Sequence, residues 1–136
     1  MIYLDNAATS FPKPPAVAEA MSELLAHAAG NPGRAGHVLA VAAQRVVGET
    51  RRVVASLLGA PDPARVVFTQ NATEAINLAL WGVLRTGDRV VTTGMEHNAV
   101  ARPLAALADR GVAVARVPCG PDGALDPADL ERALAA

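Results

Sequence analysis

Residues 66–84 of this chain read VVFTQNATEAINLALWGVL, and this stretch decides the predicted fold class because its pattern changes along its length. The first four residues, 66–69, are apolar or β-branched and predict a short buried strand. Beyond a polar turn at 70–73, apolar residues recur every three or four positions, as they do in an amphipathic helix. Glu74 follows Asn71 by three places, which is the capping-box spacing at a helix N-terminus. The stretch is therefore predicted to form a strand, a turn and a helix.

The turn at 70–73 would place a helix N-terminus just beyond the carboxyl end of a strand. The first N–H groups of a helix have no acceptor within the helix, and the helix dipole is positive there, so the position suits a phosphate or another anion. Most helix N-termini, however, bind only water and their own cap. The chain also contains neither G-x-G-x-x-G nor G-x-x-x-x-G-K-[ST]. The pattern alone leaves both an anion site and a simply capped helix open.

The rest of the chain continues the alternation of strand and helix. Two more strands are predicted at 89–93 and 112–117, where β-branched residues cluster. Pro103 is expected near the first turn of the helix between them, where proline is tolerated. The predicted helices cover 15–29, 37–58, 72–84, the segment from the turn at 94–98 to residue 110, and 128–136, and prolines mark the start of the first and the last of them.

Strands that are separated by helices of ~10 to 14 residues cannot pair as hairpins and instead form right-handed crossovers in a parallel sheet. The expected fold class is therefore α/β, with parallel-sheet βα units preceded by two N-terminal helices. Residues 30–36, GNPGRAG, lie between those two helices and include three glycines. This loop is predicted either to pass close to another part of the chain or to be a solvent-exposed linker.

Length, composition and charge exclude several classes of protein. A chain of 136 residues is expected to form one domain, and a formal net charge of −1 with both signs interspersed gives no reason to expect nucleic acid binding. No apolar run approaches the ~18 residues of a membrane span. The first ten residues lack a basic n-region, so we expect no secretory signal and a cytoplasmic protein. Cys119 is the single cysteine, which excludes an internal disulfide and a cysteine-cluster metal site.

A second polar turn, residues 94–98, follows the predicted strand 89–93 and contains His97. Ligands of open α/β sheets bind outside the carboxyl ends of the strands, so this turn and the turn at 70–73 are expected to form one site. There the His97 ring could lie over a ligand whose phosphate sits at the neighbouring helix. A lone histidine is more often an ordinary hydrogen-bonded residue, and that alternative stays open. With no second histidine or cysteine nearby, no metal site is expected.

Four segments of the chain resemble one family of enzymes. They are YLDNAAT at 3–9, NPGRAGH at 31–37, FTQNATEAINLAL at 68–80 and MEHNAV at 95–100. Together, and in this order, they resemble the class V aminotransferase family of pyridoxal-phosphate enzymes of fold type I. The similarity is greatest to the cysteine desulfurase branch, which removes sulfur from L-cysteine and leaves L-alanine. Selenocysteine lyases and other class V enzymes, including aminotransferases, share much of the pattern.

The resemblance implies a role for each matching site residue. Ala72 and Thr73 would hold the phosphate of pyridoxal 5'-phosphate, and His97 would stack on its pyridine ring and relay protons. Near the substrate would lie Asn6 to Ala8 and the loop from Arg34 to His37, which would reach the active site of a partner subunit. Asn71 stands where many relatives carry glycine.

The resemblance also implies how the chain is organised and what it binds. Residues 1–14 would be an N-terminal segment near the active site, and 15–136 would be the first part of a truncated large cofactor-binding domain. The full-length enzyme would be a homodimer that acts on an amino acid, L-cysteine in the desulfurase branch, and passes sulfur to an acceptor protein. No nucleic acid, membrane or metal ion is implied.

Activity depends on a lysine that the chain does not place where the family needs it. Pyridoxal-phosphate enzymes of this family require a lysine for the Schiff base and a carboxylate on the pyridinium nitrogen. Lys13 is the only lysine and lies between prolines before the first predicted helix. In the family both residues come after the region that corresponds to Ala136. The chain is therefore expected to be inactive alone. The alternatives are a non-catalytic phosphate-binding remnant and an unrelated βα domain of flavodoxin type.

Overall fold

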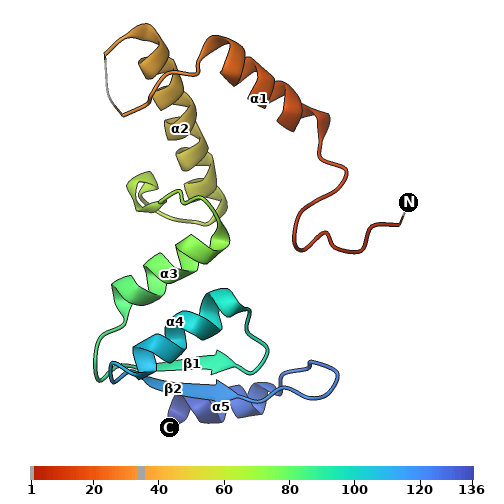
Figure 1. Ribbon diagram of the computed structural model, residues 1–136, viewed down its shortest axis with the longest axis vertical. Coiled ribbons are helices and arrows are strands. Elements are labelled where there is room, and N and C mark those ends of the chain that lie inside the picture. The colour runs from red at the N-terminus through yellow and green to blue at the C-terminus, as the bar shows by residue number, and fades with distance from the viewer. Residues whose placement is uncertain (1, 34–35) are drawn as a thin grey trace. The chain divides into compact units, whose positions relative to one another are not determined.

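The computed structural model describes residues 2–33 and 36–136 of the chain. The chain divides into two units, one that ends at Val67 and one that comprises Phe68–Ala136. The first unit contains the helices α1 (Pro15–His27) and α2 (Val38–Leu57) and the short 3-10 helix η1 (Pro63–Arg65) (Figure 1). The second contains three helices and two strands. The two predicted N-terminal helices are thus confirmed, each to within two residues at either end.

Local sequence explains where the helices of the first unit begin. Pro15 occupies the first position of α1, where the missing N–H of proline has no helical acceptor to lose. The cap of α2 is His37, whose Nδ1 accepts a hydrogen bond from the Ala40 N–H at 3.3 Å. The face of α2 that packs inward is made of small residues, with Ala40, Ala43 and Ala55 buried.

Gly30 passes against the first turn of α2. A Cβ added to Gly30 would lie 2.4 Å from the carbonyl carbon of Leu39 and 2.6 Å from the backbone nitrogen of Ala40. Contacts this short with backbone atoms leave room for no residue other than glycine. Of the two readings of the glycine-rich loop, the close approach is therefore correct at Gly30, while no atom lies within 4 Å of a Cβ at Gly36.

The second unit is built around a parallel pair of strands. It contains α3 (Ala72–Val83), β1 (Arg89–Thr93), α4 (Asn98–Ala108), β2 (Ala113–Val117) and α5 (Pro127–Ala135), in that order along the chain (Figure 1). The two strands pair in parallel, with Arg89 opposite Ala113 and Thr93 opposite Val117. Helix α4 is the crossover that joins them, as a parallel pair requires. The predicted α/β class with a parallel sheet is confirmed.

The core of this unit lies between α4 and the strands. Leu104 and Leu107 of α4 are buried with Val112, which directly precedes β2. Residues of α3 and its C-cap, of α4 itself and of both strands pack around them and complete the core: Leu80, Trp81, Leu84, Val90, Val100 and Val114. Helix α3 packs on α4, and α5 packs on both strands. This packing places the start of α3 near the start of α4.

The strand predicted at 66–69 is wrong. The backbone at Val66 is extended, with φ −86° and ψ 114°, but β1 and β2 are the only paired strands among residues 2–33 and 36–136. A strand is held by hydrogen bonds to a neighbouring strand, and residues 66–69 are not part of the two-stranded sheet. The division between the two units also falls within this segment, after Val67. Of the three predicted strands, the structure therefore contains two, β1 and β2.

Pro103 is also placed differently from the prediction. It is the sixth residue of α4 and lies inside the helix rather than near its first turn. Interior proline removes one helical hydrogen bond, because the carbonyl four residues earlier loses its donor. In α4 that carbonyl belongs to Ala99, which is buried.

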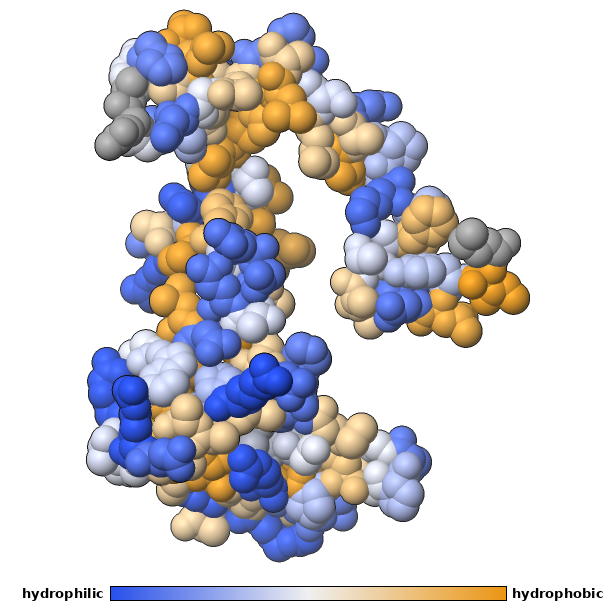
Figure 2. Space-filling view, in the orientation of Figure 1, coloured by the Kyte–Doolittle hydropathy of each residue, from blue (hydrophilic) through white to orange (hydrophobic). Residues whose placement is uncertain are grey.

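Large apolar side chains are exposed in both units. In the first unit they include Leu25, Val53 and Leu57, and Figure 2 shows apolar residues on the visible surface of α1 and α2. In the second unit Val83 and Met95 are examples.

Candidate functional site

The N-terminus of α3 is capped as the sequence predicts. Asn71 Oδ1 accepts a hydrogen bond from the Glu74 N–H at 2.9 Å. The Glu74 carboxylate reaches back, and its Oε2 accepts from the Gln70 N–H at 2.8 Å, one residue before the cap. Asn71 thus preserves the cap although the resemblance placed glycine there in many relatives. The capping box fixes the direction in which α3 leaves the turn.

Ala72 and Thr73 occupy the first two positions of α3 and offer hydrogen-bond donors. Neither backbone N–H has an acceptor within the described part of the chain. The first N–H groups of a helix have no partner within the helix, and the side chain of Asn71 accepts from the Glu74 N–H instead. Both residues are exposed. Two free N–H groups, the threonine hydroxyl and the positive end of the helix dipole are therefore available to an anion at this point.

His97 is exposed and is the N-cap of α4. Its Nδ1 accepts a hydrogen bond from the Ala99 N–H at 3.1 Å. A nitrogen that accepts a hydrogen bond carries no proton, so the neutral ring holds its proton on Nε2. Sequence reasoning missed this cap. The signal in the sequence was the position of His97 directly before a predicted helix. His37 stands in the same position before α2 and also caps its helix through Nδ1.

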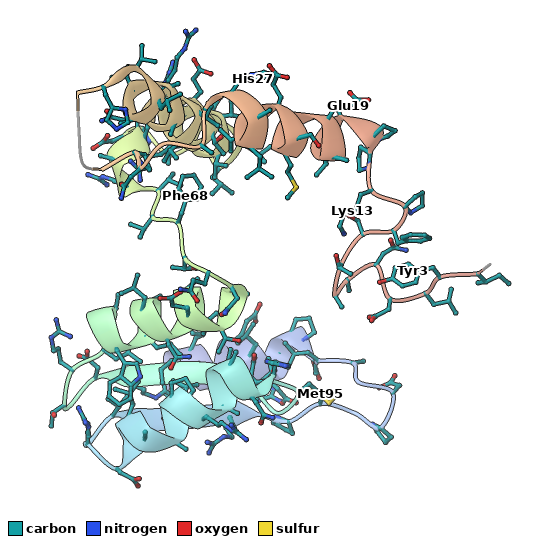
Figure 3. All side chains as sticks on the ribbon, turned by 45° about the horizontal axis from the view of Figure 1, so that its top comes forward. Tyr3, Lys13, Glu19, His27, Phe68 and Met95 are labelled. Carbon is teal, nitrogen blue, oxygen red and sulfur yellow. The ribbon has the colours of Figure 1, made fainter. Side chains whose placement is uncertain are left out.

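A hydrogen-bonded turn joins β1 to His97. Glu96 Oε1 accepts from the Thr93 hydroxyl at 2.8 Å and from the Thr93 N–H at 3.3 Å. The Met95 N–H donates to the Thr93 hydroxyl oxygen at 3.3 Å. Figure 3 shows Met95 at this turn, between β1 and α4. These bonds lower the pKa of Glu96, mainly through the Thr93 hydroxyl and next through the Thr93 backbone.

The lowered pKa of Glu96 predicts that this turn is weakened by acid. A carboxyl group whose pKa is lower in the folded state contributes stability that is complete above its ordinary pKa and is lost as the pH falls through the folded value. We expect the free energy of unfolding to fall below about pH 4.3, the ordinary pKa of glutamate, more steeply in the native sequence than in Glu96→Gln. Urea unfolding at a series of pH values measures this. Glu131→Gln, at an exposed position of α5, is the control. Equal slopes for the native chain and Glu96→Gln would contradict the prediction.

Thr73 and His97 line one hollow in the second unit. Its volume is about 490 Å³ and it lies along α3 and α4. The lining includes Asn77 and Trp81 of α3 and Arg102 of α4. The two turns that the sequence analysis grouped together are thus brought together by the fold. The hollow offers hydrogen-bond donors at one helix start, an imidazole at the other and the cationic side chain of Arg102.

The remaining predicted site residues belong to the first unit or fall outside the described residues. Asn6 holds the N-terminal segment in a turn: its Nδ2 donates to Tyr3 O at 3.3 Å, and its Oδ1 accepts from the Phe11 N–H at 3.1 Å. Ala8 is exposed, and its N–H donates to Asp5 O at 3.1 Å. His37 caps α2, and Arg34 lies outside the described residues.

Lys13 makes its contacts within the N-terminal segment. Its Nζ donates to the Thr9 hydroxyl at 2.8 Å and to Ser10 O at 2.9 Å. Figure 3 shows Lys13 in the segment that precedes α1. Both partners lie within four residues of Lys13, so the ammonium group serves the local fold of residues 9–13.

The described residues contain neither a membrane-spanning helix nor a metal-binding cluster. Within 2–33 and 36–136, none of the helices has both the length and the apolar character needed to cross a bilayer. The same residues contain no group of three or more histidine, cysteine, aspartate or glutamate side chains arranged to hold a metal ion.

Comparison with known proteins places the whole chain in one family. The family model for aminotransferase class-V matches residues 2–136. The cysteine desulfurase IscS of Stutzerimonas stutzeri (strain A1501) is 41% identical over 139 residues, a match that covers 98% of this chain and 34% of that protein. The chain therefore spans about a third of the length of the curated relatives it matches.

Solved structures agree with the sequence comparison. The apo structure of a cysteine desulfurase from Thermococcus onnurineus NA1 is 35% identical, with a TM-score of 0.84, and the match covers 98% of this chain and 34% of that one. The cysteine desulfurase CsdA from Escherichia coli is 32% identical, with a TM-score of 0.70, over 96% of this chain and 34% of that one. The resemblance of the four sequence segments is confirmed, and the chain belongs to the class V aminotransferase family.

Proposed function

We propose that this chain supplies the cofactor-binding N-terminal part of a pyridoxal-phosphate-dependent cysteine desulfurase. The reaction would convert L-cysteine to L-alanine and transfer the sulfur to an acceptor protein. The observation that carries the proposal is the hollow that Thr73 and His97 line together, with unpaired N–H groups at the start of α3. The proposal gains further support from the similarity to cysteine desulfurases along 98% of the chain.

The donor set at the start of α3 fits a phosphorylated ring cofactor. The N–H groups of Ala72 and Thr73 and the Thr73 hydroxyl would bind the phosphate of pyridoxal 5'-phosphate. His97 would face the ring, since it is exposed at the rim of the same hollow. When bound, the cofactor supplies an electron sink for the bond changes at the amino acid.

The hydrogen bond at His97 Nδ1 limits what the ring does. Because Nδ1 accepts from the Ala99 N–H, only Nε2 is left to hold or release a proton in the hollow. The same bond fixes the ring relative to the first turn of α4. His97 would thus orient the cofactor ring and relay a proton through one defined atom.

The roles of the first unit follow the resemblance and are proposals too. Residues 1–14, including Asn6 and Ala8, would lie near the substrate, while 15–136 would form the first part of the large cofactor-binding domain. The segment from Arg34 to His37 would reach the active site of the second subunit of a homodimer. We propose a cytoplasmic enzyme.

The cofactor-bound lysine is proposed to lie outside these 136 residues. Lys13 is the only lysine, and its ammonium group is already bound to Thr9 and Ser10. A chain without that lysine would bind the cofactor phosphate but would not perform the chemistry. This observation also favours a second candidate, a non-catalytic phosphate-binding remnant. Selenocysteine lyase and aminotransferase activities remain the class V alternatives to desulfurase activity.

The test compares the 136-residue chain with the product of any longer reading frame that contains it. We expect the short chain to release no sulfide from L-cysteine and to show no visible absorbance band of lysine-bound cofactor. The longer product should show the band and, with an added thiol reductant that reduces the transferred sulfur to sulfide, form alanine and sulfide in equal amounts. Alanine from selenocysteine but not cysteine, or amino transfer without sulfide, would contradict the desulfurase assignment. A frame that ends at residue 136, with phosphate binding retained, would support the remnant.

A further inference from the structure

One side chain, that of Asn77, ties the first turn of α3 to the first turn of α4. Its Nδ2 donates to Thr73 O at 2.9 Å, one turn earlier on α3. It also donates to Ala99 O on α4 at 3.4 Å, across 22 positions in the sequence. An amide nitrogen carries two hydrogens, so one side chain can serve both carbonyls. The second bond is long, yet it is the direct polar link between the two helix starts among the described residues.

Pro103 explains why the Ala99 carbonyl needs a donor from another helix. In a regular α-helix this carbonyl would accept from the N–H of residue 103, and proline has none. Ala99 is 6% exposed and Pro103 is also buried, so water has little access to the carbonyl. Asn77 supplies the donor that Pro103 lacks. The sequence pair Asn77 and Pro103 is thus one device for docking α4 on α3.

Ala99 transmits this link to His97. Its carbonyl accepts from Asn77 on one side, and its N–H donates to His97 Nδ1 at 3.1 Å on the other. Three hydrogen bonds, joined by the Asn77 side chain and by the backbone of Ala99, therefore connect the Thr73 carbonyl to the imidazole. All of these residues line the same hollow: Thr73, Asn77, His97 and Ala99.

We infer that Asn77 is a positioning residue that sets the His97 ring relative to the anion-binding turn at Thr73. The inference rests on the proposed function for what these two turns hold. Asn77 itself needs to touch neither cofactor nor substrate. Its effect is to hold the turn at Thr73, which would contact the cofactor phosphate, at a fixed position relative to the His97 ring, which would contact the cofactor ring.

If Asn77 only stabilised α3, its substitution would leave the His97 ring unchanged, and two variants of Asn77 test this. Alanine has a higher helix propensity than asparagine, so Asn77→Ala keeps or strengthens α3 while it removes both side-chain hydrogen bonds. Any change at His97 in that variant therefore comes from the lost link and not from a melted helix. Asn77→Gln retains the amide donors on a side chain one methylene longer and serves as the conservative variant.

The experiment measures the imidazole nitrogen chemical shifts of the 136-residue chain by NMR, at a pH that keeps histidine neutral. His37 is the internal control, because its Nδ1 accepts from the Ala40 N–H in the same way but lies in the other unit. We expect both rings of the native chain to show the Nε2–H tautomer. In Asn77→Ala, His97 should lose this preference while His37 keeps it, and Asn77→Gln should restore it in part. Unchanged shifts of His97 in Asn77→Ala would overturn the inference.

A titration with pyridoxal phosphate separates this inference from the proposed function. Asn77→Ala should weaken binding about threefold to tenfold, because the free energy of one neutral hydrogen bond, that between Asn77 and Ala99, no longer holds the two turns in the arrangement that binds the ligand. If the His97 shifts change but the native chain binds no pyridoxal phosphate, the positioning role is supported and the proposed function fails. If native and variant chains bind equally and His97 is unchanged, the proposed function stands and the positioning role fails.

Discussion

Replacing His97 by alanine is expected to lower the desulfurase turnover of an enzyme that contains this chain by roughly 10²- to 10⁴-fold, the usual contribution of a proton-transferring side chain. The variant loses the ring that lines the hollow together with Thr73. It also loses the Nδ1 acceptor that caps α4. Turnover is measured as alanine formed from L-cysteine under saturating cofactor.

Asparagine at position 97 separates the ring from the cap. Asparagine is a good N-cap residue, so His97→Asn keeps an acceptor for the first turn of α4 while it removes the imidazole. If the ring acts on the cofactor, His97→Asn and His97→Ala lose activity alike. Recovery of activity in His97→Asn would show that the cap alone matters and would contradict the proposed role of the ring. His27→Ala, at an exposed position of α1, is the matched control.

Replacing Gly30 by alanine is expected to destabilise the first unit by about 1–3 kcal/mol, the usual cost of inserting atoms into a filled space. The new Cβ would lie 2.4 Å from the Leu39 carbonyl carbon, so the backbone of the loop or of α2 has to move. The cost should appear as a lower denaturation midpoint in urea at an unchanged m-value.

Gly48 provides a control of opposite sign within α2. A Cβ at Gly48 meets no atom within 4 Å, and the residue lies in the helix interior. Gly48→Ala should therefore stabilise the chain by up to about 1 kcal/mol through helix propensity alone. If Gly30→Ala and Gly48→Ala shift the midpoint in the same direction, the close packing of Gly30 against α2 is not present in solution.

The elements that depend on neighbouring residues could be predicted from the sequence. The capping box at Asn71 and Glu74, the helix that follows it and the proline at the start of α1 all involve contacts within four positions. The absence of a strand at 66–69 could not be predicted in this way, because whether a segment forms a strand depends on a partner strand elsewhere in the chain. Only the extended backbone at Val66 agrees with the prediction.

The site shows the same limit. The sequence correctly predicted that Thr73 and His97 lie at one site, and for His97 the predicted reason also holds, since its turn follows the carboxyl end of β1. For Thr73 the reason is different: no strand precedes its turn in the described part of the chain, and the packing of α3 on α4 brings it to the hollow. The roles of Asn77 and Pro103 were missed, because the bond from Asn77 to Ala99 spans 22 positions and matches no local pattern. Thr93 and Glu96, three apart at the end of β1, were detectable as a short-range pair but were not singled out.

The central claim is that one hollow receives an anion at the start of α3 and a ring at His97. The most direct measurement is an amide and imidazole NMR titration of the 136-residue chain with pyridoxal phosphate, compared with inorganic phosphate. We predict that phosphate shifts the amides of Ala72 and Thr73, and that pyridoxal phosphate shifts these amides and the His97 ring together. Shifts confined to other residues, or shifts of His97 without those of Thr73, would contradict the claim.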